Sequence, residues 1–307
     1  MVMDPLEAAD PATDTSVALM SAALERGHRV RWCRSGDLWL DGGHVGASSQ
    51  PAGRDGSGRV VSTGPAAPVP LAGHDVVLVR PDPPVDAAYL AMTLLLEQAR
   101  GDTVIVNDPR ALREANEKLY ATRFPGLMPA HLVTADPDRL TAFAGAVGEA
   151  VIKPLDGHGG RDVVRVVAGA PGTAALLGRL THGGRVPVMA QEFLPAVAEG
   201  DRRILLLEGA PLGVVRRVPA PGEFRANLGL GGRAERCELD DADRRIIAAL
   251  APTLVADGLA LVGIDVVGGR LTEVNVTSPT GLCQLAALTG TRPDLEVVDW
   301  LERAAGR

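Results

Sequence analysis

The chain has 307 residues, of which 46% are hydrophobic and 22% charged, and its formal net charge is −7. This composition is sufficient for a sizeable core and excludes a disordered chain, while 3% aromatic residues and a negative charge argue against a nucleic-acid-binding protein. The 31 basic residues comprise 29 Arg and only two Lys, Lys118 and Lys153. These two lysines are therefore candidates for positions that Arg does not fit.

The sequence gives no indication of a membrane span, a secretory leader or a cysteine motif. No apolar run approaches the length of a membrane span, and the first 24 residues carry four acidic residues and no Lys or Arg, unlike a secretory leader. Cys33, Cys237 and Cys283 are widely spaced and form no CxxC pair, so neither a disulfide framework nor a zinc site is expected. We expect a soluble, cytoplasmic chain.

The first part of the chain alternates short strands with helices. Apolar runs predict strands at 28–33, 75–80 and 103–107, and periodic segments predict helices at 15–26 and 86–100. This pattern indicates an open βαβ domain over roughly the first 110 residues. Gly, Pro and Ser are frequent from 41 to 73, which predicts a loop or a loose hairpin. The proline-rich turn at 80–84 places Arg80 at the edge where open α/β sheets bind ligands.

The second part is typical of an α+β module. A helix is expected at 240–257, and hairpin-like strands are expected at 150–155, 162–167, 188–193, 202–208, 211–217, 261–267 and 270–275. The boundary between the two parts is expected near residues 110–125.

A glycine-rich loop follows the strand that carries Lys153. Gly157, Gly159 and Gly160 would let backbone amides approach a polyphosphate while the ammonium reaches an oxygen. No Lys-Ser/Thr pair follows, so this is not a P-loop, and an ordinary hairpin turn is an equally good interpretation of the loop alone. His158 is better interpreted as a loop histidine than as a general base.

A second glycine-rich stretch, residues 228–234, superficially matches the GxGxxA pattern of dinucleotide-binding folds. Prolines and a glycine precede it instead of a strand, so that interpretation is disfavoured. A mobile lid that carries Arg225, Asn227 and Arg233 fits better, and a disordered surface loop is the alternative.

Two further segments carry candidate ligands. Glu273 and Asn275 project from one face of a strand, and Asp265 lies on the strand before it, so three hard oxygen ligands suited to Mg²⁺ come together. A charged outer face would have a similar pattern. The segment Glu192, Phe193 and Leu194 leaves a strand and enters a linker, where backbone groups can bind an adenine edge.

The order of these motifs resembles that of the bacterial glutathione synthetases, which are ATP-grasp carboxylate–amine ligases. The resemblance runs almost end to end, through residues 2–5, 80–84, 116–119, 153–157, 200–203, 225–228, 231–233 and 271–280. It implies an α/β and α+β ATP-grasp fold with an N-terminal Rossmann-like pre-ATP-grasp domain at 1–115 and an ATP-grasp domain at 116–307. The latter would contain a central lid subdomain at about 123–195 and a catalytic part at about 196–307, with a mobile lid loop at 218–236.

The resemblance also implies a role for each motif residue. ATP would contact Lys118, Lys153, Asp156, Gly157, Gly159, Gly160, Glu192, Phe193, Leu194 and Asp201. Two Mg²⁺ or Mn²⁺ ions would be held by Asp265, Glu273 and Asn275. The reacting groups would contact Arg203, Arg217, Arg225 and Asn227, and the peptide substrate Arg80, Ser278, Pro279 and Thr280. The implied reaction joins γ-glutamylcysteine and glycine, and the implied assembly is a homotetramer.

Two departures from the family pattern leave alternatives open. Cys283 and Gln284 stand where the family usually has Arg and Glu, and the lead-in to the first strand is shorter than usual. The first departure favours, as an alternative, a related ligase of specialised metabolism that joins another carboxylate and amine. A protein that senses a nucleotide without turnover is a third possibility, disfavoured because both lysines and all three metal-ligand candidates are present.

Overall fold

The computed structural model describes residues 1–101, 103–157 and 159–306, so His158 lies outside the described residues. Short parallel strands lie at the centre of the N-terminal part. β6 (Val76–Leu78) pairs in parallel with β7 (Val104–Val106), and Val2 makes parallel bridges to Cys33 and Val79. Helices α1 (Thr15–Glu25) and α2 (Ala87–Glu97) connect these strands, as the sequence predicted. Each helix begins where an Asp side chain, Asp14 or Asp86, accepts hydrogen bonds from first-turn N–H groups.

Residues 41–73, predicted to be a loop or a loose hairpin, form paired strands of a five-stranded antiparallel sheet, so the hairpin pairing is confirmed and the loop is not. The strands of this sheet are β1 (Val30–Trp32), β2 (Leu38–Asp41), β3 (His44–Arg54), β4 (Val60–Ser62) and β5 (Ala67–Pro70), and β3 pairs with each of the others. The glycines of β3 allow neighbouring side chains to pack directly against the backbone of the strand. A Cβ on Gly46 would lie 2.0 Å from the Trp39 ring, and one on Gly53 would lie 2.7 Å from Thr63 Cγ2. At these two positions, glycine is needed because a neighbouring side chain packs against the backbone.

A second antiparallel sheet follows two short helices, α3 (Pro109–Glu114) and α4 (Glu117–Ala121). It has the strand order β10-β9-β11-β8 and is covered by α5 (Pro137–Val147) and α6 (Thr173–Leu180) on one face. Its strands are β8 (His131–Thr134), β9 (Glu149–Pro154), β10 (Val164–Val167) and β11 (Val188–Glu192). The sequence pattern predicted the last three of these strands and missed β8, α5 and α6.

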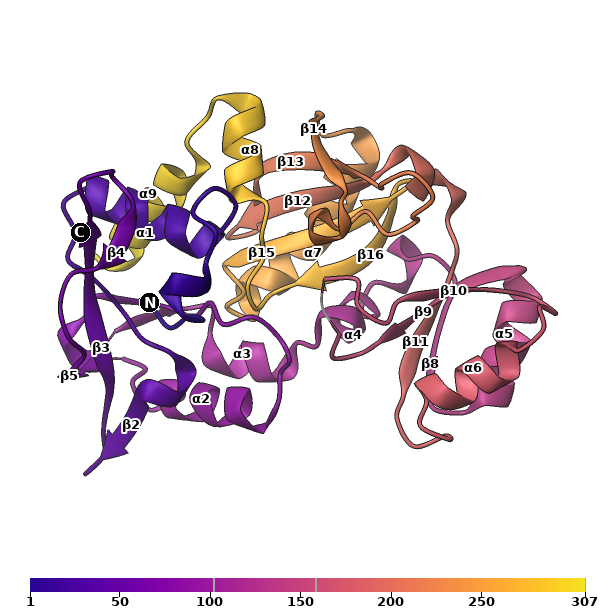
Figure 1. Cartoon of the computed structure of the whole chain (residues 1–307), viewed down its shortest axis with the longest axis horizontal. Coiled ribbons are helices and arrows are strands. Elements are labelled where there is room, and N and C mark those ends of the chain that lie inside the picture. Colours follow the sequence, from indigo (N-terminus) through magenta and orange to yellow (C-terminus); the bar gives the residue numbers. More distant parts are fainter. Residues whose placement is uncertain (102, 158, 307) are drawn as a thin grey trace.

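The third large sheet has the order β14-β13-β12-β15-β16. It comprises β12 (Asp201–Leu207), β13 (Ala210–Val218), β14 (Arg233–Arg236), β15 (Leu261–Val267) and β16 (Arg270–Asn275), with α7 (Asp241–Ala256) between β14 and β15. Figure 1 shows α4 between this sheet and the β8–β11 sheet. β14 occupies the last part of the predicted lid, so residues 233–236 are paired strand and only the preceding part is irregular.

Two C-terminal helices return to the N-terminal part. α8 (Leu282–Thr289) and α9 (Pro293–Ala304) follow β16, and α9 packs beside α1, where Arg26 donates a hydrogen bond to Glu302. The two ends of the chain therefore lie on the same side of the molecule (Figure 1). None of the helices in the described ranges is both long enough and apolar enough to cross a membrane.

Candidate active site

One pocket, with a volume of about 360 Å³, collects almost all of the predicted site residues. It lies where α4, the glycine-rich loop, the linker after β11 and the strands β12, β13, β15 and β16 meet. Of the residues predicted to contact ATP, metal or substrate, only Asp156, which is exposed, and Arg80, which is buried, do not line it. Motifs that extend from Asp82 to Thr280 in the sequence therefore form one site.

The three metal-ligand candidates face one another across β15 and β16. Asp265 is the cross-strand partner of Glu273, and the Asn275 Nδ2 donates to Asp265 Oδ2 at 3.3 Å. Val274 and Val276 point to the opposite, fully buried side. The alternation predicted from the sequence is confirmed, because the polar and apolar residues of β16 occupy opposite faces.

Two arginines cross-link the carboxylates of this pocket. Arg203 donates through Nε to Asp265 Oδ1 at 2.6 Å and through Nη2 to Oδ2 at 3.0 Å, and Arg217 Nη2 lies 3.1 Å from Oδ1. Arg217 also donates through Nε to Asp201 Oδ1 at 2.7 Å. Burial alone would raise the pKa of Asp265, but the two guanidinium groups lower it below its usual value. The carboxylate of Asp265 is therefore ionised and neutralised within the protein.

The two lysines differ in their surroundings. Lys118 Nζ lies 2.9 Å from Glu273 Oε1 and donates to Gly157 O at 2.6 Å. Burial opposes its charge, yet the Glu273 carboxylate raises the pKa of Lys118 above its usual value. Burial lowers the pKa of Lys153, and no described residue accepts a hydrogen bond from its ammonium. Lys153 thus has spare capacity for an anion.

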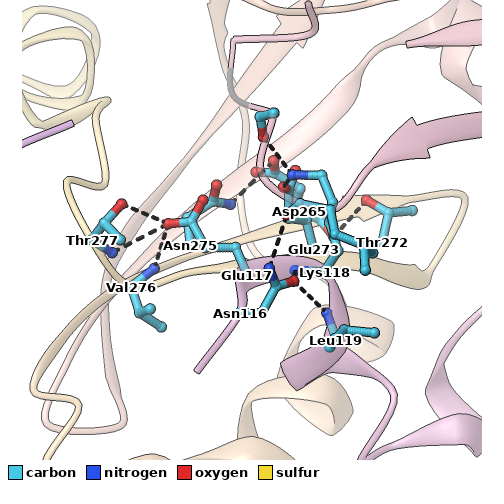
Figure 2. Close-up of polar contacts among 12 residues, drawn as sticks. Asn116, Glu117, Lys118, Leu119, Asp265, Thr272, Glu273, Asn275, Val276 and Thr277 are labelled. Carbon is cyan, nitrogen blue, oxygen red and sulfur yellow. Dashed lines mark hydrogen bonds and ion pairs between the residues drawn. The ribbon is translucent and has the colours of Figure 1, made fainter. Parts of the chain in front are cut away.

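A residue that the sequence analysis did not select, Glu117, fastens the end of β16 to α4. Its Oε1 accepts hydrogen bonds from Val276 N at 3.0 Å, Thr277 N at 3.2 Å and Thr277 Oγ1 at 2.8 Å (Figure 2). Asn107 holds the same backbone from the other side, since its Nδ2 donates to Val276 O at 2.7 Å. Burial, followed by the charge of Glu273, raises the pKa of Glu117. The turn after β16 is therefore held at both its N–H and its C=O groups.

The irregular part of the predicted lid touches the glycine-rich loop. Arg225 Nη1 donates to Gly160 O at 3.0 Å, and its Nη2 pairs with Glu223 at 2.6 Å. A Cβ on Gly160 would lie 2.6 Å from Asn227 Oδ1. Arg225 and Asn227 also line the pocket, so this segment forms one of its walls.

The linker after β11 offers one backbone donor to the pocket. The N–H groups of Glu192 and Phe193 donate to Ala130 O and Glu149 O, which leaves that of Leu194 with no acceptor among the described residues. The Phe193 ring meets the ring of Phe224 edge to face, with centroids 6.3 Å apart. Phe224 belongs to the predicted lid and was also missed by the sequence analysis, although two of the chain's four Phe residues meet here.

The other end of the pocket is formed by the turn after β16 and the start of α8. Arg80 Nη2 donates to Pro279 O at 3.1 Å, its Nε donates to Ser16 Oγ at 3.2 Å, and Arg203 Nη1 donates to Thr280 O at 3.0 Å. Burial lowers the pKa of Arg80, which has no carboxylate partner within ion-pair distance among the described residues. Arg80 is therefore attached to the wall of the pocket through the turn that follows β16.

The donor set fits a metal that shares its ligands with a substrate. Within the described ranges, no group of three or more His, Cys, Asp and Glu side chains is placed to hold a metal ion. Asp265 and Glu273 supply two carboxylates, and Asn275 retains its amide oxygen. Mg²⁺ is commonly bound through one or two carboxylates together with phosphates and water, so this set suits Mg²⁺ carried by a nucleotide better than a resident ion.

Comparisons with known proteins agree on the family. The family model described as "Prokaryotic glutathione synthetase, N-terminal domain" matches residues 1–113, and "Prokaryotic glutathione synthetase, ATP-grasp domain" matches residues 117–290. A glutathione synthetase of Parasynechococcus marenigrum is 49% identical over 288 residues, which cover 94% of this chain and 93% of that protein. One from Thermosynechococcus vestitus is 43% identical over 311 residues, or 98% of each chain.

Solved structures show the same fold at much lower identity. The ATP-grasp ligase PsnB, solved with a minimal precursor, Mg and ADP, has a TM-score of 0.63 and 18% identity, over 100% of this chain and 98% of that one. This likeness shows an ATP-grasp fold, and the sequence matches span both halves of the chain. The chain therefore belongs to the prokaryotic glutathione synthetase family.

Proposed function

We propose that this chain ligates γ-glutamylcysteine and glycine to glutathione at the expense of ATP, which becomes ADP and phosphate. The observation that supports it best is the pocket in which Lys118, Lys153, Arg203 and Arg217 face Asp265 and Glu273. Joining a carboxylate to an amine requires activation of the acid, and a pocket rich in cations favours attack of a carboxylate on a triphosphate. Relatives named glutathione synthetase supply the identity of the acid and the amine.

The first step is phosphoryl transfer. A carboxylate oxygen of the dipeptide attacks the γ-phosphorus, the bond to the β-phosphate oxygen breaks, and ADP leaves with an acyl phosphate remaining. Lys153, which has no internal acceptor, would bind phosphate oxygens from the sheet side, and Lys118 from the α4 side. The Leu194 N–H would donate to the adenine edge, with Phe193 beside the ring. Asp201 would keep Arg217 oriented in the pocket.

The second step is attack of the amine nitrogen on the acyl carbon, followed by loss of phosphate and of a proton from nitrogen. Arg203 and Arg217 would bind the acyl phosphate, and Arg225 would stabilise the oxyanion. Because an acyl phosphate reacts with water, the segment with Arg225 and Asn227 would close over the glycine-rich loop to exclude water. Arg80 and the Ser278, Pro279 and Thr280 turn would orient the dipeptide.

Mg²⁺ would be held by Asp265, Glu273 and Asn275 and would neutralise phosphate oxygens. We propose two ions, of Mg²⁺ or Mn²⁺. Exchanging Glu273 or Asn275 for Ala is expected to abolish ligation at ordinary Mg²⁺ and to weaken Mg²⁺-dependent ATP binding in equilibrium titrations. Near-normal rates and binding would remove that residue from the metal site.

A second candidate substrate pair is favoured by one observation. Cys283 and Gln284 carry no charge at the end of the pocket that receives the acid, since burial raises the pKa of the Cys283 thiol to about 11. A related ligase acting on another acid and amine would fit the same ATP chemistry.

A phosphate-release assay separates the candidates. Turnover of γ-glutamylcysteine plus glycine above every other pair in a panel of acids and amines supports our proposal. Turnover of a different pair alone would select the second candidate, and ATP binding without turnover of any pair would favour a nucleotide sensor. Homotetramer formation and a cytoplasmic location are further proposals that rest on family resemblance, and light scattering in solution tests the first.

A further inference from the structure

The lid segment, residues 219–232, connects β13 to β14 and touches the opposite side of the pocket in two places. At the first, Arg225 Nη1 donates a hydrogen bond to Gly160 O at 3.0 Å. At the second, the rings of Phe224 and Phe193 meet edge to face, with centroids 6.3 Å apart and an angle of 74° between the ring planes. The first contact is with the loop that we propose to lie over the phosphates, and the second is with the linker that we propose to hold adenine.

The Phe193 ring is fixed from one of its faces. The guanidinium carbon of Arg165 lies over the ring, 3.8 Å from its centroid, and Arg165 Nε donates to Glu149 Oε2 at 2.9 Å. The Phe193 N–H also donates to Glu149 O at 2.9 Å. Phe193 is therefore anchored to the first residue of β9. A base that packs on Phe193 must use its other face or an edge, because Arg165 covers this face.

The neighbourhood of the two rings is apolar. Leu194 and Val197 follow Phe193 in the chain, Val151 lies on the neighbouring strand β9, and all of them line the pocket together with Phe224. Apolar walls with one well-placed polar group are typical of a site for a flat heteroaromatic ring, and the Leu194 N–H is such a group. Of these five residues, Phe224 alone belongs to the lid segment.

A bound base would therefore lie within reach of the lid segment. A purine is about as long as the distance between the two ring centroids, so a base beside Phe193 also reaches Phe224. Aromatic contacts of this kind change a binding constant by about two- to tenfold. The only regular structure in the lid segment is η6 (Leu228–Leu230), so the segment is held by few contacts and one added contact can change its position.

We propose that Phe224 is a positioning residue that packs on the adenine base and makes closure of the lid segment depend on the base as well as on the phosphates. The inference rests on the proposed function, because it takes adenine to bind at Phe193 and Leu194. It gives Phe224 no part in the chemistry. A phosphate compound without a base would engage the lid segment at Gly160 and leave the contact at Phe224 unmade.

Two ligands that differ in the base test this inference in the full-length protein. ADP and ribose 5-diphosphate, each with Mg²⁺, differ only because the second carries a hydroxyl in place of adenine. At saturation, ADP should slow backbone amide hydrogen exchange in residues 219–232 about three- to tenfold more than ribose 5-diphosphate does. Phe224→Ala should remove this difference. It should also weaken ADP binding about two- to tenfold and leave the Kd of ribose 5-diphosphate unchanged, so that the loss belongs to the pair of ring and base.

Two further variants separate the ring from the rest of the lid segment. Leu230→Ala shortens an apolar side chain at the other contact, where a Cβ on Gly160 would lie 3.1 Å from Leu230 Cδ1. It should change the protection by the two ligands by the same factor, because this contact does not involve the base. Phe224→Tyr keeps the ring and should retain the difference between the two ligands.

Each outcome either supports or overturns the inference. A native chain that binds neither ligand would overturn the proposed function and the inference together. If ADP binds but protects residues 219–232 no more than ribose 5-diphosphate does, the inference alone is overturned. Equal weakening of both ligands by Phe224→Ala also overturns it, and so does native-like protection of that variant by saturating ADP. If the base dependence is found but γ-glutamylcysteine and glycine are not ligated, the proposed substrates fail and the inference stands.

Discussion

The two ends of the pocket differ in how their charges are satisfied. At the end that we propose to hold the metal, called the metal end below, Asp201, Asp265 and Glu273 are each paired with Arg217, Arg203 or Lys118 within 2.9 Å. At the other end, which we propose to bind the acid, Arg80 and Gln284 each keep a buried polar atom that has no partner among the described residues. The carboxylates of the first end are therefore paired within the protein, although Lys153 there has no acceptor among the described residues, whereas neither of the two polar atoms at the second end has a partner among them.

This difference explains how one pocket can accept a highly charged nucleotide and still select a small acid. ATP bound with the two divalent ions that we propose would carry little net charge, so it could replace internal ion pairs without a large electrostatic cost. Unsatisfied atoms, in contrast, reward only a ligand that presents the right donor and acceptor. We expect changes at the metal end to abolish turnover and changes at the other end to alter selectivity.

The largest expected effect is at Asp265, on which both arginines converge. Asp265→Asn leaves Arg203 and Arg217 buried beside a neutral amide. Removing one partner of a buried ion pair lowers the free energy of unfolding by about 3–5 kcal/mol. The substitution also removes a proposed metal ligand, so ligation should fall at least about 1,000-fold. Phosphate release and thermal melting measure the two effects.

Asp138→Asn, at an exposed position, is the matched control and should match the native chain in both measurements. An Asp265→Asn enzyme that melts normally and retains more than a tenth of its activity would contradict the view that the metal end depends on balanced charge.

The lysines provide the next test of the metal end. Lys118→Arg and Lys153→Arg keep the charge but replace a compact ammonium by a planar fork, in a pocket where Lys118 is already held by Gly157 O and Glu273. Each change should weaken ATP binding or turnover by about 10- to 100-fold, the equivalent of a charge-assisted hydrogen bond of roughly 1.5–3 kcal/mol. Equilibrium binding of ATP with Mg²⁺ measures it.

Full activity of both Arg variants would mean that these lysines reflect chance in an Arg-rich composition. Arg139→Lys, the reverse exchange at an exposed position, shows whether such a swap alone affects the fold.

Both lysines could be selected from the sequence because they stand in local motifs, and the same is true of Asp265, Glu273 and Asn275. Glu117 could not be selected in this way. Its hydrogen bonds to Val276 and Thr277 cross 159 and 160 residues of sequence, and a Glu at the start of a short helix ordinarily indicates only favourable helix-terminus charge. Gln284 is visible in the sequence as an unusual residue, but its unsatisfied oxygen is visible only in the fold.

The fold was predictable where apolar runs are regular. The strands β9, β11, β12, β13, β15 and β16 follow runs of Val, Ile and Leu, and their expected positions are confirmed. The sheet around β3 escaped prediction because its glycines and prolines indicate turns in the sequence, while in the fold Trp39 covers the backbone of Gly46. Packing between residues of different strands determines whether such segments form strands or turns. Local sequence patterns do not contain that information.

Glu117 connects the two ends of the pocket and should give an intermediate effect. Glu117→Ala removes the acceptor of the Val276 and Thr277 N–H groups, so the melting temperature should fall and the KM for the acid should rise about 10-fold, since each lost acceptor costs about 1–3 kcal/mol. Glu117→Gln keeps an acceptor oxygen and should restore most of the KM. If Gln behaves as Ala does, the charge of Glu117 and not its hydrogen bonds positions the turn.

The difference in stability between the native chain and the Gln variant should also depend on pH. Burial raises the pKa of Glu117 above its ordinary value of 4.5, so the folded native chain binds this proton more tightly than the unfolded chain. The stability that Glu117 contributes to the native fold is therefore fully present below pH 4.5. It is lost as the pH rises through the raised pKa. Glu117→Gln does not titrate, so its melting temperature should rise relative to that of the native chain as the pH increases above 4.5.

The smallest expected effect tests the wall that covers both ends. Gly160 and Gly159 both have positive φ angles, of 77° and 64°, so Ala at either position carries similar backbone strain. Only at Gly160 would a Cβ meet a neighbour, Asn227 Oδ1 at 2.6 Å, while at Gly159 nothing lies within 4 Å. Gly160→Ala should therefore push the Asn227 segment from the loop and let water reach the acyl phosphate.

We expect Gly160→Ala to raise ATP hydrolysis relative to ligation by about two- to fivefold, a change of roughly 0.4–1 kcal/mol in the competition between water and amine. Gly159→Ala should leave this ratio unchanged, even if its ATP binding is weaker. Parallel assays of phosphate and ligated product give the ratio directly. Equal ratios in the two variants would show that the contact between Gly160 and Asn227 does not exclude water, because backbone strain is common to both changes and only the contact differs.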